Sequence, residues 1–262
     1  MRTSRTTRSR LPLVAVATAA ALLGVGGCGS EDSGPLGDVL KAPSTSAPQP
    51  TGGSTGGPTR SGSPAPTSSK RQLDLVPTQE QLDGAVLTTA DLPAGSSVEA
   101  LPTGGAEPVA EKAACRPMMD LVTINAGTVK PHAHKSITYS LASASKGTNA
   151  AVIASFAPGQ AQRILSDGIA AIDACSSFTG AKDGVTVTYT VSSRSDPHLG
   201  DESVSLRLDT AVGGQSIPSG YTIVRVGNVV TEFVYVEVSS RAFALPDQSV
   251  VRKQVDKLKA IR

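Results

Sequence analysis

Residues 221–238 read YTIVRVGNVVTEFVYVEV, and this stretch decides the fold. Two runs rich in β-branched residues flank the dipeptide Gly227-Asn228, whose members accept a positive φ at low cost. A two-residue connection of this kind typically joins adjacent antiparallel strands. The stretch therefore predicts a tight hairpin with strands at residues 221–226 and 229–238, and it makes an antiparallel sheet the expected framework.

Further strands and helices are expected on both sides of this hairpin. Alternating or short apolar runs predict four more strands, at residues 136–144, 150–156, 185–191 and 203–209. Helical spacing of apolar residues predicts helices at residues 79–87, after Pro158-Gly159 and at 246–261, and one helix or a pair of short helices at 107–124. This order predicts an α+β fold, in which helices pack on one antiparallel sheet of about six strands and residues 72–262 form a single domain.

The first 27 residues have the composition of a signal peptide. They carry four Arg and no acid, and their apolar run at residues 11–25 is short for a transmembrane helix. The end of the run, LLGVGGC at residues 22–28, resembles the lipobox of bacterial lipoproteins. That resemblance implies cleavage before Cys28 and a diacylglycerol on its thiol, which would anchor the chain to the extracytoplasmic face of the cell membrane. An ordinary secretory signal followed by an unrelated cysteine is the alternative.

Residues 28–71 are expected to form a disordered linker behind this anchor. They consist mostly of Ser, Thr, Gly and Pro, and they hold too few large apolar groups to offset the entropy of ordering. A flexible coil of this length spans about 35 Å, so it would act as a tether for the folded domain.

The charge of the folded part argues against nucleic acid as a partner. From residue 72 onward the chain has 16 Lys and Arg against 19 Asp and Glu, a formal charge of −3. Such a domain has no basic surplus to neutralise a row of phosphates. The whole chain has no Trp, four Tyr and four Phe, and so few aromatic platforms on which bases or sugars could stack.

Cys115 and Cys175 are the two cysteines of the exported part, and an even number outside the cytoplasm favours a disulfide. Both lie on apolar stripes of expected helices, so the bond would join the early helix to the central one. A redox-active pair is disfavoured, because the chain has no C-x-x-C motif.

The three histidines of the chain are the residues most open to a metal-binding interpretation. His132 and His134 lie two residues apart, and His198 is close in sequence to the acids Asp196, Asp201 and Glu202. These side chains suit zinc or copper, but the set lacks a compact ligand spacing. Solvated loop histidines are the favoured interpretation, so we expect neither a metal nor a cofactor.

The sequence contains no nucleophile elbow, phosphate loop, zinc-protease helix or kinase motif. Gly200-Asp201-Glu202-Ser203 offers two carboxylates and a hydroxyl, the groups that acid/base chemistry uses. Adjacent strand residues point to opposite faces of a sheet, however, so the two acids are not expected to converge. A turn that leads into a strand is favoured, with Asp201 bonded to turn amides, and no catalytic residue is assigned.

Several short stretches together resemble one known group of proteins. They are LTTADLP at residues 87–93, Cys115, the helix end Ala174-Cys175, LGDES at 199–203 and VRVGN at 224–228. In this order they are similar to actinobacterial lipoproteins whose exported domain resembles the extracellular sensor domain of PknH-type serine/threonine kinases. The resemblance implies a non-catalytic domain with a cleft for an unidentified small ligand. The chain departs from the kinase-attached pattern in having one cysteine pair instead of two and no kinase domain.

The leading functional hypothesis is a membrane-anchored surface lipoprotein with a sensor-like, ligand-binding domain that is not an enzyme. An unknown small ligand or an envelope protein is the expected partner, besides the membrane itself. The first alternative is an envelope interaction or accessory module. The second is an unrecognised hydrolase that uses the acids at residues 200–203.

Overall fold

The computed structural model describes residues 75–101, 108–142, 146–182 and 184–262. The expected signal peptide, the linker and Cys28 lie outside these residues. The described α-helices are α2 (Gln79–Ala85), α3 (Arg116–Leu121), α4 (Gln160–Ala174) and α5 (Gln248–Ala260), with short 3-10 turns η1 (Thr89–Asp91) and η2 (Ala113–Cys115). None of the helices in this part of the chain is both long and apolar enough to cross a membrane.

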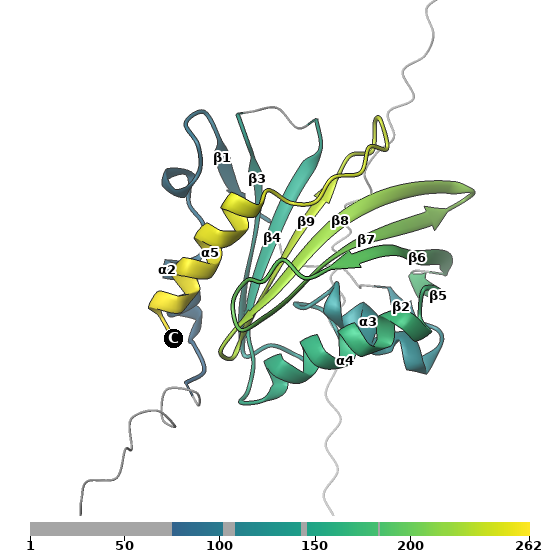
Figure 1. The fold of residues 1–262 in the computed structure, drawn as a ribbon, viewed down its shortest axis with the longest axis horizontal. Helices are drawn as coiled ribbons and strands as arrows, with labels where there is room; N and C mark the ends of the chain where they lie inside the picture. The colour runs from purple at the N-terminus through teal and green to yellow at the C-terminus, as the bar shows by residue number, and fades with distance from the viewer. Residues whose placement is uncertain (1–74, 102–107, 143–145, 183) are drawn as a thin grey trace, which may run out of the picture. The chain divides into compact units, whose positions relative to one another are not determined.

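The strands form one antiparallel sheet in the order β1-β3-β4-β9-β8-β7-β6-β5-β2 (Figure 1). They are β1 (Ser97–Ala100), β2 (Val109–Ala110), β3 (Ala133–Ser140), β4 (Thr148–Ser155), β5 (Ser177–Lys182), β6 (Val185–Ser195), β7 (Glu202–Val212), β8 (Gln215–Val226) and β9 (Val229–Val236). The hairpin predicted at Gly227-Asn228 is confirmed, with Val226 paired to Val229 and a φ of 61° at Gly227. The central hairpin therefore organises the sheet as expected.

The expectation of about six strands is wrong, because the described sheet has nine. The three strands that the sequence analysis did not predict are β1, β2 and β5. β1 and β2 are the outermost strands and contain four and two residues, too few to show a period. β5 reads SFTGAK and has a glycine in its interior, which weakens a strand signal.

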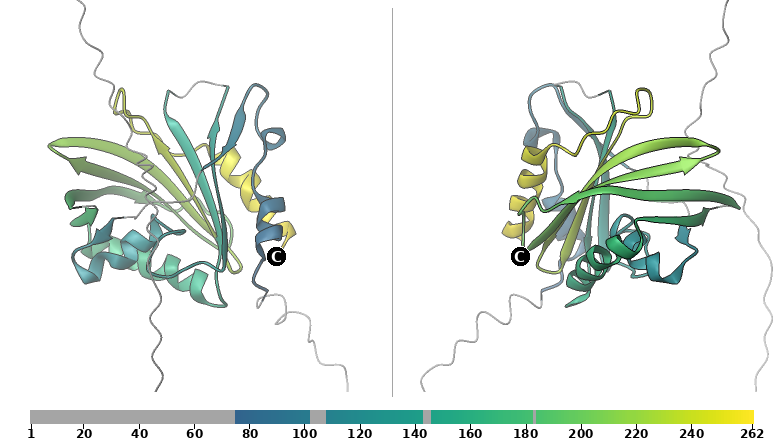
Figure 2. Two further views of the ribbon diagram at one scale, coloured as in Figure 1. Left: turned by 180° about the vertical axis from the view of Figure 1, so that it is seen from behind. Right: turned by 45° about the vertical axis from the view of Figure 1, so that its right-hand side comes forward.

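Helices cover both faces of the sheet. In β4, Val152 and Ala154 belong to one apolar cluster, whereas Ala151 and Ile153 belong to the other. α3 and α4 contribute to the first cluster, and α2 and α5 to the second. Figures 1 and 2 show the same arrangement, with α2 and α5 on one side of the twisted sheet and α3 and α4 on the other. The central strands are thus buried on both faces, which explains why β9 is apolar at successive positions.

The expected helix at residues 107–124 is shorter than its sequence pattern. Its first part forms β2 and the turn η2, and only Arg116–Leu121 is α-helical. The helices expected after Gly159 and near the C-terminus are confirmed as α4 and α5. α5 also carries Gln254, which is 0% exposed. Its side chain donates to the carbonyl of Ala85, the last residue of α2, and accepts from the amide of Leu87 just beyond it.

Candidate functional site

The disulfide between Cys115 and Cys175 positions the segment that forms the candidate site. Cys115 ends η2 and Cys175 follows α4 directly; their Cα atoms are 5.5 Å apart and both side chains are 0% exposed. The predicted bond is therefore present in the structure. It fixes the start of α3 against the end of α4, next to a pocket.

A pocket of about 220 Å³ lies beside α3. Its walls come from the short edge strand β2, from α3 and from the segment that follows α3. They are lined by Pro108, Val109, Ala110, Arg116, Met119, Asp120, Thr123, Ala126, Gly127, Thr128 and Lys130. None of these residues was predicted to be functional from the sequence. No motif marks them, and only the fold brings their segments together.

Asp120 shapes the pocket by holding the segment that follows α3. Its two carboxylate oxygens accept hydrogen bonds from the amide of Thr128 at 2.6 Å and from the hydroxyl of the same residue at 2.5 Å. Gly127 packs so closely on Asp120 that a Cβ would lie 2.6 Å from the carboxylate oxygen. The same segment is tied to the sheet where the amide of Ile124 donates to the buried Glu232 in β9, at 3.3 Å. The pocket wall is therefore a braced segment of chain.

Two positive charges line the pocket, Arg116 at the start of α3 and Lys130 at the end of the braced segment. Neither forms an ion pair with any described residue. The ammonium of Lys130 donates one hydrogen bond, to the carbonyl of Ala126 at 3.1 Å. A smaller hollow of about 130 Å³ shares Asp120 with the pocket and is also lined by Arg163 and Asp167 of α4.

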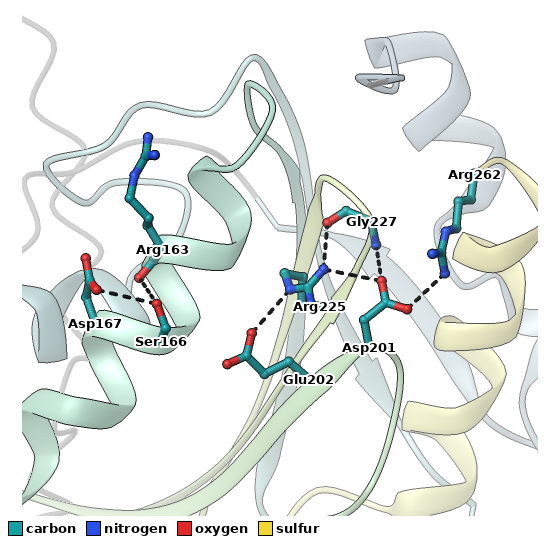
Figure 3. Close-up of polar contacts among 8 residues, drawn as sticks. All are labelled: Arg163, Ser166, Asp167, Asp201, Glu202, Arg225, Gly227 and Arg262. Carbon is teal, nitrogen blue, oxygen red and sulfur yellow. Dashed lines mark hydrogen bonds and ion pairs between the residues drawn. The ribbon is translucent and has the colours of Figure 1, made fainter. Parts of the chain in front are cut away.

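The acids at residues 201 and 202 form a second polar cluster, at the end of the β8–β9 hairpin (Figure 3). Asp201 and Glu202 both contact Arg225, each at 3.3 Å. Asp201 precedes β7, so the strand alternation on which the expected divergence rested does not apply to it; the two carboxylates contact different nitrogens of Arg225. Asp201 also accepts a hydrogen bond from the amide of Gly227 at 2.7 Å and pairs with Arg262 at 2.9 Å. The amide that Asp201 bonds thus belongs to the hairpin turn, and the carboxylates are matched by arginines.

Ser203, near the start of β7, is bonded to the loop that precedes this strand. Its hydroxyl donates to Asp196 at 2.8 Å and accepts from the amide of Leu199 at 3.0 Å. His198 contacts the other oxygen of Asp196, at 3.1 Å. Hydrogen bonds from the amide of His198 and from Ser203 lower the pKa of Asp196. In a serine hydrolase the histidine stands between the acid and the serine, whereas here the acid stands between them.

The three histidines do not form one cluster of metal ligands. His134 is part of β3, His132 precedes that strand, and the side chain of His198 is 85% exposed. Throughout the described residues, no three His, Cys, Asp or Glu side chains gather as metal ligands would. The structure therefore does not bring the three histidines and the acids near His198 together as one set of metal ligands.

Comparisons with known proteins show a similarity of fold. No protein-family model matches the chain, and no curated protein matches it significantly. Among solved structures, the extracellular domain of PknH from Mycobacterium tuberculosis aligns with 71% of this chain and 99% of its own length, at 11% identity and a TM-score of 0.48. The similarity concerns the fold alone, and membership of a lipoprotein class stays a prediction.

Proposed function

We propose that this protein is a membrane-anchored lipoprotein whose exported domain binds a small ligand without transforming it. The pocket beside α3 is the observation that carries the proposal, since it combines apolar walls with a few polar groups, as binding sites do. The disulfide between Cys115 and Cys175 suits an oxidising compartment outside the cytoplasm. The lipobox-like sequence before Cys28 supplies the anchor.

Native mass spectrometry tests the binding part of this proposal. The full chain is isolated in mild detergent from the organism that encodes it, and its mass is compared before and after denaturation. We expect a small-molecule adduct that is lost on denaturation. The adduct should be strongly reduced in Ala126→Leu, which fills the pocket, and retained in Ala260→Leu, a control at the end of α5.

An intact mass without adduct, in protein that is folded and disulfide-bonded, would contradict ligand binding. The envelope interaction module would then become the leading hypothesis. An adduct that persists in Ala126→Leu would move the binding site away from this pocket.

A further inference from the structure

The lining of the pocket beside α3 carries more positive than negative charge. Arg116 and Lys130 are exposed, and neither forms an ion pair within the described parts of the chain. The carboxylate of Asp120 lines the same pocket, but both of its oxygens are occupied by Thr128. Two cations against one carboxylate give the lining a formal charge of +1, so an anion could pair with Arg116 and Lys130 without displacing Asp120 from Thr128.

The remaining walls are largely apolar. Val109 is a large apolar residue that is 56% exposed, and it lines the pocket together with Pro108, Ala110 and Met119. An exposed valine beside a proline and a methionine favours contact with an apolar group. The volume of about 220 Å³ is below the 300–1,000 Å³ of sites for drug-sized molecules. The apolar part of a ligand would accordingly be short, a few carbons long.

We propose that this pocket binds a small amphiphilic anion, with a carboxylate or phosphate head between Arg116 and Lys130 and a short apolar tail against Val109 and Met119. This inference rests on the proposed ligand-binding function and names the ligand's chemistry. Arg116 supplies a planar fork of donors that matches either head group. Lys130 keeps two further N–H donors after its bond to Ala126.

A methionine can report binding in this pocket, because the chain has only three methionines and their signals can be told apart. Met119 lines the pocket, whereas its neighbour Met118 is 0% exposed and is not part of the lining. The full chain is labelled with carbon-13 at the methionine methyl groups and titrated in mild detergent with hexanoate, hexyl phosphate and the neutral hexanamide. Met119→Leu assigns the signal, and Met118 serves as the internal control.

We expect hexanoate or hexyl phosphate to shift the Met119 signal saturably, with an affinity at least about tenfold above that of hexanamide, the range of one charge-assisted hydrogen bond. The double variant Arg116→Gln/Lys130→Gln should lose this preference and leave hexanamide binding unchanged. Arg252→Gln, a matched exposed arginine on α5, should bind as the unmodified chain does. Partition of a given probe into micelles is the same for every variant, so it cancels when the unmodified chain, the double variant and Arg252→Gln are compared with that probe. The stronger of the two anions identifies the head group.

Equal binding of hexanamide, or no effect of the double variant, would overturn the inference while leaving ligand binding intact. The same holds if no probe moves the Met119 signal although the isolated protein retains a ligand. Absence of both a shift and a retained ligand would overturn the inference and the proposed function together.

Discussion

Asp91 stabilises the packing of η1 on α5. Its carboxylate is 2.7 Å from the ammonium of Lys257 and accepts a hydrogen bond from the amide of Thr88 at 2.9 Å. Burial by itself raises the pKa of Asp91, but the bonds from Lys257 and Thr88 outweigh burial and lower the pKa to about 2. The side chain is 15% exposed, so solvent screens this pair less than a surface pair.

We therefore predict that Asp91→Asn lowers the free energy of unfolding by about 2 kcal/mol at neutral pH. Because the folded pKa lies below the unfolded value, this stability is present above about pH 4 and is lost as pH falls through about 2. Urea unfolding at several pH values measures the gap between the two proteins. Asp173→Asn, which removes a surface ion pair of an aspartate 76% exposed, should change little. A gap that stays constant down to pH 2 would contradict the assignment.

We expect Asp201 to stabilise the folded domain and to have no role in catalysis. Asp201→Asn weakens one hydrogen bond to Gly227 and the ion pairs with Arg225 and Arg262, which should cost about 1–2 kcal/mol. Glu202→Gln loses one contact at 3.3 Å and should cost less than about 1 kcal/mol. Thermal unfolding measures both.

A screen against esters, glycosides, peptides and phosphoesters should find no turnover above background. An activity that disappears in Asp201→Asn or Glu202→Gln while the melting temperature is unchanged would instead support a hydrolase. The pairing of both carboxylates with arginine is the physical reason for expecting the first result.

At the scale of elements, the disulfide joins η2 and α4 across 60 residues of sequence. Replacing both Cys115 and Cys175 with Ala should lower the free energy of unfolding by about 4 kcal/mol, the loop-closure entropy of a chain of this length. Urea unfolding gives the value, and non-reducing peptide mapping of the unmodified protein should recover the cross-linked pair. Two alkylatable thiols in the native protein would show that the bond is absent.

The sequence predicts the centre of the fold well and its edges poorly. Gly227-Asn228 and the β-branched runs beside it encode β8, β9 and their turn locally, so this hairpin needs no tertiary information. β2 contains two residues and exists because Val109 and Ala110 pair with β5. No local pattern marks such a strand, because tertiary pairing alone defines it.

The candidate site likewise has parts that the sequence predicts and parts that depend on tertiary contacts. Cys115 and Cys175 are identifiable from sequence, because residue type and compartment together favour a bond. Asp120 is not identifiable, because its role depends on the return of Thr128 eight residues later. A pocket that depends on contacts of this kind, between residues brought together by folding, has no sequence motif. Only the three-dimensional structure reveals it.

For the whole molecule, attachment to the membrane depends on a single residue in our interpretation. Cys28→Ala should release the protein from membranes after export, because the remaining polar linker has no acyl chain to insert. Fractionation in high salt and carbonate measures this, with Ser30→Ala as the control that should stay attached. A Cys28→Ala protein that still sediments with membranes would exclude the lipid anchor.

The two ends of the described domain meet the same turn. Asn228 donates to the carbonyl of Leu75 at 3.0 Å, and Arg262 pairs at 2.9 Å with Asp201, which bonds the amide of Gly227. This proximity makes the domain a candidate for circular permutation. A short Gly/Ser bridge from residue 262 to 75, with new ends opened between Gly213 and Gly214, should preserve the sheet and the disulfide. These two glycines have nothing near their Cβ positions, so the cut would disturb no packing. Circular dichroism and peptide mapping of the permuted chain would show whether its topology depends on the order in which the strands are synthesised.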